Sequence, residues 1–494
     1  MIFSEIAWTD MILILWEGEM EKLQYWKFIV PLLIGVGICL IPVPQGLQPN
    51  AWYYFAVFST AIAALILEPI PAAAVGLIGV TVAGALLLVT PKPADSLKWV
   101  LSGFSNGTVW LIFIAFMFAK GYEKTGLGRR LALLLVRALG KKTLGLGYAI
   151  AMADLILAPF TPSNTARSGG TIFPIIKNIP PLYDSQPGET AGKIGSYLMW
   201  TALATTCITS SMFLTALAPN LLAIELVKKT ASVSISWAEW AKGFLPVGLF
   251  LFAVTPYLIY KIYPPEVKVS NDVPVWAAEE LSKIGKISRK EVIMALLAIV
   301  ALTLWIFGGD WFKLDATMAA LIVFCAMILT GIISWDDVIG NKQAWNVLVW
   351  FATLVTLADG LKLVKFLDWF AVLTAGAMKG IPVLTAMLLF VAIFFIVHYM
   401  FASVTAHVAA LLPVFLAAAM AIPGMPVKLL ALMFCYSLGI MGIITPFATG
   451  PSPIYYGSGF IPGKDFWRLG LIFGAINLIA FLVIGYPYLS WITP

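Results

Sequence analysis

The sequence is poor in charge, in histidine and in cysteine. Asp, Glu, Lys and Arg together make up 11% of the 494 residues, against about 25% in an average soluble domain. The two histidines belong to no metal-spaced cluster, and no Ser-His-Asp arrangement is evident. We therefore expect neither an enzyme nor a bound metal or cofactor. The cysteines are too widely spaced for a metal pair or a disulfide framework, and we interpret them as small buried hydrophobic residues: Cys39, Cys207, Cys325 and Cys435.

The N-terminal segment lacks the features of a cleaved signal peptide. It reads MIFSEIAWTDMILILWEGEMEK, with acidic residues and no lysine before Lys22, whereas a signal peptide begins with basic residues and ends in a small-residue cleavage site. We interpret residues 1–27 as a retained lead-in. The formal net charge of +6 lies in short connections beside apolar runs, where membrane topology accounts for it. We therefore expect no nucleic-acid partner.

Apolar residues are abundant instead. They make up 61% of the chain, and the mean hydropathy is +0.94. Runs long enough to cross a hydrocarbon core roughly 30 Å thick recur from end to end. The pattern predicts an all-α polytopic membrane protein with about eleven transmembrane helices. The expected spans are 28–45, 52–67, 71–90, 108–122, 195–230, 242–262, 290–308, 315–333, 344–360, 427–458 and 464–491.

Two further apolar runs, 143–178 and 382–422, are too long for one crossing and carry polar residues near the middle. A re-entrant hairpin, which enters and leaves on the same side, fits each of them. The basic segments 120–142 and 261–290 indicate cytoplasmic loops. Counting spans outward places the N-terminus inside and the C-terminus outside, with the first hairpin open to the cytoplasm and the second to the exterior. Without a transit peptide, a bacterial cytoplasmic membrane is expected.

The two halves of the chain resemble each other. The stretch PFTPSNTARSGGTIFP in the first half corresponds to YMFASVTAHVAALLP in the second. Each half also repeats one order of elements: crossing, amphipathic segment, hairpin, long interrupted crossing, crossing. Because the two hairpins are expected to open to opposite sides, we predict inverted repeats, which many secondary transporters contain.

A polar connection separates the repeats. The expected segments are a lead-in (1–27), scaffold helices with an interfacial arm (28–142), the first hairpin and broken helix (143–263), a cytoplasmic linker (264–289), a second scaffold unit with its arm (290–381), and the second hairpin and broken helix (382–494). The first arm, GLGRRLALLLVRALGKK, keeps leucines on one face and arginines on the opposite face. Such a helix is expected to lie in the membrane interface.

The middle of each hairpin is polar, although an unpaired backbone amide in hydrocarbon costs several kcal/mol. Such chain survives only inside protein or beside a water-filled cavity. Each returning arm begins a helix whose free amide groups and positive dipole end favour an anion. The alternative is that the polar residues only cap the helix. We define tip 1 as Ser163, Asn164 and Thr165, and tip 2 as Ser403, Val404 and Thr405.

The long crossing after each hairpin is interrupted by proline and polar residues. Proline removes an amide donor and clashes with the preceding turn, so both crossings should unwind there. We name residues 213–220 (FLTALAPN) break 1 and residues 444–453 (ITPFATGPSP) break 2. Interrupted helices in corresponding halves point to a transporter binding site. A proline kink without a ligand is the alternative.

These motifs carry a family resemblance. PSNT, the polar second tip and the proline-rich breaks resemble the divalent anion:sodium symporter superfamily, the INDY-type carboxylate transporters. ASVTAHVAALLPV and TPFATGPSPIYYGSGF are similar to its exchanger branch, which includes bacterial citrate/succinate and tartrate/succinate antiporters and plastid 2-oxoglutarate/malate translocators. The resemblance implies a homodimer whose hairpins and broken helices move as an elevator against a scaffold. It implies substrate contacts at Ser163, Asn164, Thr165, Pro219, Asn220, Ser403, Val404, Thr405, Thr449, Gly450 and Pro451.

Tip 2 departs from the sodium-coupled members of the family, which carry Ser-Asn-Thr at both tips. Val404 offers no side-chain oxygen to a hard cation. We expect Arg167 and His407, one turn past the tips, with Lys120 or His398, to balance a dianion in place of sodium. Because an unpaired cation costs roughly 2.5 to 3.5 kcal/mol in the membrane, the empty carrier should resist crossing. This charge balance predicts obligatory exchange.

Other interpretations of these side chains are open. Arg167 pairs with Asp154 in one of them, and His407 is a neutral, hydrogen-bonded packing residue in another. In a third, His398 serves the structure rather than the substrate, and Lys120 anchors the end of its helix.

Two tips and two cations suit a ligand with two carboxylates. The sequence therefore predicts sodium-independent, electroneutral antiport of C4 and C5 dicarboxylates such as malate, succinate, fumarate and 2-oxoglutarate, with citrate and tartrate left open. Sodium-coupled symport of di- or tricarboxylates is the alternative within transport. An anion channel is the alternative in another class, although the chain lacks the rings of repeated charge that line charge-selective pores.

Overall fold

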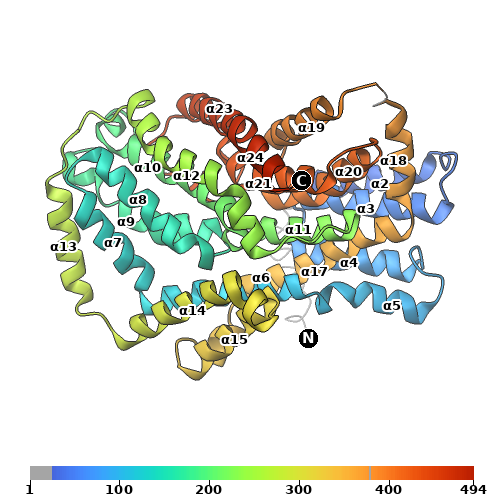
Figure 1. Cartoon of the computed structure of the whole chain (residues 1–494), viewed down its shortest axis with the longest axis horizontal. Helices are drawn as coiled ribbons and strands as arrows, with labels where there is room; N and C mark the ends of the chain where they lie inside the picture. The colour runs from blue at the N-terminus through green and yellow to red at the C-terminus, as the bar shows by residue number, and fades with distance from the viewer. Residues whose placement is uncertain (1–24, 378–379, 494) are drawn as a thin grey trace, which may run out of the picture.

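The computed structural model describes residues 25–377 and 380–493, and the named elements in these ranges are helices (Figure 1). Most of the expected lead-in, 1–27, lies outside them. The first half contains α2 (Trp26–Leu40), α3 (Pro49–Leu67), α4 (Ala72–Ala85), α5 (Pro93–Leu101), α6 (Gly107–Thr125), α7 (Leu127–Leu139), α8 (Thr143–Leu157), α9 (Phe173–Ile176), α10 (Gly195–Met212), α11 (Ala218–Ala231) and α12 (Trp237–Ile262). The connection contains α13 (Asp272–Ile284).

The second half begins with α14 and ends with α24. Its helices are α14 (Arg289–Phe312), α15 (Ala316–Leu329), α16 (Trp335–Ile339), α17 (Lys342–Leu363), α18 (Phe366–Ala377), α19 (Val383–Val397), α20 (Val404–Met420), α21 (Val427–Ile440), α22 (Ser452–Gly457), α23 (Gly463–Ala480) and α24 (Tyr486–Ile492).

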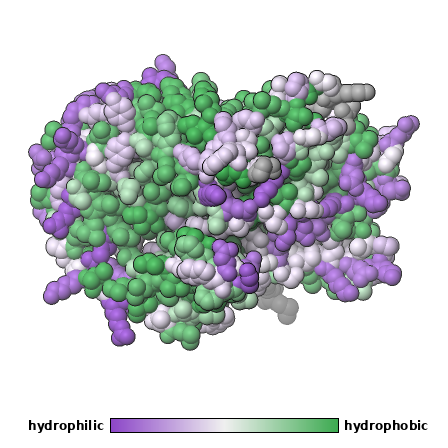
Figure 2. Space-filling model, in the orientation of Figure 1, coloured by the Kyte–Doolittle hydropathy of each residue, from purple (hydrophilic) through white to green (hydrophobic). Residues whose placement is uncertain are grey.

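Eight helical segments of the described chain are long and apolar enough to cross a membrane. They are Pro49–Leu67, Pro93–Thr125, Thr143–Phe160, Trp237–Ile262, Arg289–Phe312, Lys342–Leu363, Val383–Met400 and Gly463–Ile492. Shorter apolar helices, such as α2 and α15, accompany them. In Figure 2, apolar residues cover much of the middle of the visible face, and hydrophilic residues gather mostly toward the two ends of the long axis. The all-α membrane class is confirmed, while the number of crossings stays a prediction.

The two hairpins open at opposite ends of α12, whose 26 residues span about 39 Å. Beyond the C-terminal end of α12, Thr143 at the base of hairpin 1 donates its amide to Lys268 and its hydroxyl to the Val267 carbonyl. At the N-terminal end, Lys428, just after hairpin 2, pairs with Glu239 (2.8 Å). The hairpins therefore face opposite ways, as inverted repeats require. Which end faces the cytoplasm stays a prediction.

The returning arms of the two hairpins differ in shape. In hairpin 1 the chain forms a π-helix over Thr165–Ile172 before the short α9, whereas hairpin 2 returns as the continuous α20. Gly169 lies in the π-helix, where an added Cβ would lie 2.3 Å from Ile454 Cδ1 of α22. π-helical turns often mark functional sites, and here the turn brings hairpin 1 against the second half of the chain.

Two expectations about burial are wrong. Cys207 and Cys435 are buried, but Cys39 and Cys325 are exposed, because an apolar run does not distinguish a lipid-facing side from a core-facing side. In α7, Arg130 is 9% exposed and its Nε pairs with Glu291 of α14 (2.5 Å). The arm therefore does not keep all its arginines toward the interface. Instead, one of them ties the arm to the second half.

Candidate substrate site

Each tip is capped by its own serine. At tip 1 the Ser163 hydroxyl accepts a hydrogen bond from the amide of Ala166 (3.2 Å), and at tip 2 the Ser403 hydroxyl accepts one from the amide of Ala406 (3.4 Å). Corresponding residues of the two repeats thus make the same cap. The capping interpretation holds at both tips, and each hydroxyl keeps its own hydrogen for a further acceptor.

Tip 1 lies against both breaks. The carbonyl of Pro162, which precedes the tip, accepts a hydrogen bond from the amide of Ala218 in break 1 (2.7 Å). The Asn164 side-chain amide donates to Thr449 Oγ1 in break 2 (2.8 Å), and both side chains are buried. Three of the four polar segments that the sequence singled out therefore meet.

Break 2 approaches tip 1 too closely for any residue but glycine at position 450. A Cβ added to Gly450 would lie 1.8 Å from Thr165 Oγ1, far inside the usual separation of non-bonded atoms. Pro451, which is buried, follows as the residue before α22. Gly450 and Pro451 therefore determine how closely the second half approaches tip 1.

Asn220 holds break 1 in its unwound shape. Its Nδ2 donates to the carbonyls of Ser210 (2.7 Å) and Phe213 (3.2 Å), which the interruption of the helix leaves free. Its Oδ1 is buried and has no hydrogen-bond partner among the described residues. Pro219 lies in the first turn of α11, where its missing amide is tolerated. Asn220 Oδ1 is therefore one polar atom of break 1 that is available to a ligand.

Arg167 is fully buried and paired. Its Nε lies 3.1 Å from Asp154 Oδ2, and the two side chains are 0% and 1% exposed. Its Nη1 donates to the carbonyls of Thr161 (2.9 Å) and Ala216 (2.8 Å), and its Nη2 donates to Ser210 Oγ (3.0 Å). The expectation that Arg167 offers an unpaired charge to the substrate is therefore wrong. The guanidinium instead connects hairpin 1 with break 1.

His398 makes the corresponding contact in the second half. Its Nε2 donates to the carbonyl of Ala448 in break 2 (2.9 Å). Ala448 precedes Pro451 as Ala216 precedes Pro219 in break 1. In each half, therefore, a basic side chain from the hairpin binds the alanine carbonyl of the break. His398 is thus the residue of the second half that is equivalent to Arg167 in this contact, although the alignment of the two hairpin sequences matches Arg167 with His407.

His407 lies in an aromatic pocket. The rings of Phe394, Phe401 and His398 surround it, with ring centroids 4.3, 5.0 and 5.0 Å away. Neither ring nitrogen has a hydrogen-bond partner in the described ranges. His407 is thus a packing residue, but without the hydrogen bond that the packing interpretation assumed. Buried polar atoms are rarely left unpaired, yet His398 Nδ1 also has no hydrogen-bond partner in the described chain. The charge-balancing role of His407 stays a prediction.

Lys120 lies away from both tips. Its Nζ pairs with Glu123 of the same helix (3.1 Å), one turn before the end of α6. It also lines a cavity of about 950 Å³ that borders hairpin 1 on both sides of tip 1, at Thr161 and Ala166. Its placement fits a helix-end anchor at the mouth of this cavity better than a charge at the tips.

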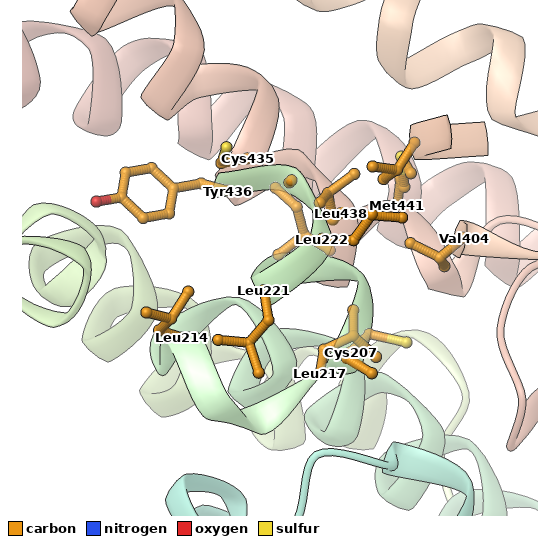
Figure 3. Packing of buried hydrophobic residues seen from close by; sticks show 14 of the residues in the cluster. Cys207, Leu214, Leu217, Leu221, Leu222, Val404, Cys435, Tyr436, Leu438 and Met441 are labelled. Carbon is orange, nitrogen blue, oxygen red and sulfur yellow. The ribbon is translucent and has the colours of Figure 1, made fainter. Parts of the chain in front are cut away.

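Tip 2 does not line this cavity in the described chain. Val404 and Thr405 are buried. In Figure 3, Val404 points toward buried apolar residues of α11 and of the turn after α21, among them Leu222 and Met441. Valine at this position thus belongs to the packing between the two halves. The structure brings tip 1 and the two breaks together next to the cavity, whose described lining includes the neighbours of tip 1 but no residue of either break, and it packs Val404 of tip 2 among apolar side chains.

Sequence reasoning missed the hydroxyl residues of α10. Thr206, Thr209 and Ser210 face Arg167 and Asp154, and all three are fully buried. The signal was present as the run TTCITSS in a buried helix. Without a partner to satisfy these hydroxyls, such a run would be costly at this depth.

Residues 22–493 match the family described as the sodium:sulfate symporter transmembrane region. The chain belongs to the sodium:sulfate symporter family. This confirms the resemblance that the tips and breaks indicated. Similar proteins include the L-tartrate/succinate antiporters of Shigella sonnei and Escherichia coli. Each is 48% identical to this chain over 475 residues, and the alignment covers 94% of this chain and 97% of the relative.

Solved structures share the fold of this family member at low identity. The Alcanivorax borkumensis YdaH transporter matches with a TM-score of 0.56 and 16% identity, over 85% of this chain and 97% of that one. The Neisseria gonorrhoeae MtrF efflux pump matches with a TM-score of 0.52 and 13% identity, over 93% and 97%. The comparisons place the chain among membrane transporters and not among enzymes.

Proposed function

We propose that the protein is a sodium-independent antiporter of C4 and C5 dicarboxylates, among them succinate, malate, fumarate, 2-oxoglutarate and tartrate. The observation that carries this proposal is the meeting of tip 1 with both breaks beside a cavity of about 950 Å³. The relatives that are 48% identical are named L-tartrate/succinate antiporters, which supports exchange and adds tartrate to the expected substrates. A bacterial cytoplasmic membrane is the proposed location.

Helix ends supply the attraction for a dianion. The π-helix begins at Thr165, α11 begins at Ala218 and α22 begins at Ser452. These starts belong to the three segments that meet at tip 1. Helix starts carry free amide hydrogens and a positive partial charge, so their convergence favours carboxylate groups. With Arg167 neutralised by Asp154, we propose that the substrate meets these helix ends rather than a bare guanidinium.

Transport requires that the part of the protein that holds this site move relative to the rest. Hairpin 1, the breaks and α10 are bonded to one another through Arg167, Asn164 and Asn220, and hairpin 2 is bonded to break 2 through His398. We therefore propose that they move together as an elevator. The remaining helices would form the scaffold, and the family resemblance suggests a homodimer built on it.

Counterflow in proteoliposomes tests the proposed function. With succinate inside and labelled tartrate, malate or succinate outside, in sodium-free buffer, we expect rapid uptake of label that disappears when the internal dicarboxylate is omitted. Adding sodium outside should not change the initial rate. Protein-free liposomes and liposomes loaded with a monocarboxylate are the controls. Currents far above carrier turnover would instead indicate a channel.

Sodium-coupled symport is the second candidate, because tip 1 keeps Ser163, Asn164 and Thr165 and Asn220 Oδ1 lacks a partner in the described chain. Uptake that follows a sodium gradient into liposomes without internal dicarboxylate would establish it and overturn exchange.

Substituting each histidine separately should give unequal effects. His398→Ala leaves the buried Ala448 carbonyl without its donor, which costs about 1–3 kcal/mol and distorts break 2. We expect at least about a tenfold loss of exchange. His407→Phe keeps an aromatic ring among Phe394 and Phe401 and should retain most activity. Initial counterflow rates of purified variants measure both. The reverse order of effects would contradict the placement of the two rings.

A further inference from the structure

The buried carboxylate of Glu225 joins α11 to the start of α6. Glu225 is 4% exposed. Its Oε1 accepts a hydrogen bond from Asn106 Nδ2 (2.7 Å), and its Oε2 accepts one from Thr108 Oγ1 (3.1 Å). Asn106 is also the N-cap of α6, with its Oδ1 accepting from the Val109 amide. The carboxylate therefore lies at the positive end of a helix, bound by two neutral donors.

A second polar contact lies one turn further along α11. Lys229 Nζ pairs with Asp359 Oδ1 of α17 (3.2 Å), and the Lys229 carbonyl accepts a hydrogen bond from Lys362 Nζ (2.6 Å). Residues four apart lie on the same face of a helix, so Glu225 and Lys229 hold one face of α11 against two different helices. We name these two contacts the α11 clamp.

An aromatic stack lies between the site and a smaller cavity beside the clamp. Trp305 of α14 stacks between Trp237 and Phe160, with ring centroids 5.9 and 6.5 Å away, and Phe213 stacks on Trp237. The smaller cavity, of about 460 Å³, is lined by Glu225 and by Leu214 at the start of break 1, but by no residue of hairpin 1 within the described chain. At this end of the molecule, Trp237 and Trp305 line the cavity and separate it from Phe160 of hairpin 1.

The opposite end is open. The cavity of about 950 Å³ that borders hairpin 1 on both sides of tip 1 is also lined by the C-terminal part of α6, at Ala119 and Lys120, whereas the clamp holds the N-terminal end of the same helix. The 19 residues of α6 are about 28 Å long. One end of α6 thus borders the larger cavity, with Tyr122 packed on Phe160 of hairpin 1 beside it, and the other end is fastened to α11.

We propose that the α11 clamp is a state-specific lock: it closes one side of the transporter while the other side is open, and it must release in every transport cycle. The proposal rests on the proposed function, because only a carrier that alternates between two states needs such a release. α11 begins in break 1 and is bonded to tip 1 through Ala218, so movement of the site pulls Glu225 and Lys229 away from α6 and α17.

The rate at which a cysteine in the open cavity reacts with maleimide tests the lock, and this measurement needs no substrate. Ala119→Cys, in a chain whose native cysteines are replaced by alanine, places a reporter thiol in the open cavity. A hydrogen bond to a charged group contributes roughly a ten- to hundredfold factor to an equilibrium. Glu225→Ala should therefore shift the population away from the open cavity, and we expect maleimide labelling of the reporter to slow about threefold or more.

Further variants separate the lock from a general loss of structure. Thr108→Val removes one donor only and should give a smaller change in the same direction. Lys229→Asp should slow labelling, and Lys229→Asp combined with Asp359→Lys should restore it. Lys228→Gln is the matched control, since Lys228 is exposed on the same turn and has no ion-pair partner within the described residues.

The outcomes distinguish the two proposals. Labelling rates that stay within the control range in both Glu225→Ala and Lys229→Asp, with monodisperse protein, would overturn the lock. Counterflow on the wild-type chain is measured separately. If no dicarboxylate gives counterflow but the labelling rates shift as expected, the proposed substrates are wrong and the proposed lock is supported.

Discussion

Asp154→Asn is expected to destabilise the protein severely. The substitution keeps the shape of the side chain but leaves the Arg167 guanidinium, which is 0% exposed, without its counter-charge. Breaking a buried ion pair on one side costs about 3–5 kcal/mol, a large part of the roughly 5–15 kcal/mol that stabilises a typical protein. We expect a strongly lowered thermal transition in detergent and little monodisperse protein on size-exclusion chromatography.

The double variant Asp154→Asn with Arg167→Gln shows whether charge is the cause. Removing both charges together is often close to neutral for folding, so stability should largely return. Exchange should not return, because glutamine is shorter and has two donors instead of five, so it cannot bind the carbonyls of Thr161 and Ala216 and the α10 hydroxyls together as the guanidinium does. Thr206→Val, which removes one weaker contact of Arg167, is the matched control. A stable Asp154→Asn variant with normal exchange would contradict the structural role of the pair.

Gly450→Ala is expected to abolish most exchange while the fold survives. The added methyl group would lie 1.8 Å from Thr165 Oγ1, so either the Thr165 hydroxyl must turn away or break 2 must move off tip 1. Overpacking of this kind costs about 1–3 kcal/mol, and it falls directly on the Asn164–Thr449 contact beside it. We expect at least about a tenfold lower initial counterflow rate.

Two comparisons make this result specific. Gly457→Ala lies at the end of α22, the short helix that follows break 2, and its added Cβ meets no atom within 4 Å in the described chain, so it should behave like the wild type. If the clash is the cause, Gly450→Ala combined with Thr165→Ala should be no worse than Thr165→Ala alone, because neighbouring substitutions need not add. If Gly450→Ala lowers the counterflow rate as strongly in the Thr165→Ala background as in the wild type, the clash with Thr165 is not the cause.

The caps at the two tips and the two breaks could be predicted from the sequence pattern. Equivalent hairpins predicted equivalent caps, and Ser163 and Ser403 make the same hydrogen bond in the structure. Proline and polar residues predict the breaks, and both crossings are interrupted just before a helix whose first turn contains a proline, Pro219 in α11 and Pro453 in α22. These features depend on a few neighbouring residues, so the sequence contains the information that produces them.

The contacts of the basic side chains could not be predicted from the sequence pattern. Arg167 and His407 occupy matching positions, yet one makes a buried ion pair and the other packs among aromatic rings. Asp154 was available as a partner from the sequence, but the two carbonyls and the α10 hydroxyls that complete the Arg167 site come from other segments. A pairing among several segments depends on distances that no local pattern contains.

By itself the sequence determined the membrane class, the two hairpins, the polar breaks and the family, because each follows from hydrophobic length, turn chemistry or motif. Only the tertiary structure decided that Arg167 is neutralised, that His398 rather than His407 binds the second break, that Val404 lies in an apolar layer and that Glu225 fastens α11 to α6. The physical reason is that the charge and hydrogen bonding of a buried group depend on which distant groups surround it, and that neighbourhood is created by folding.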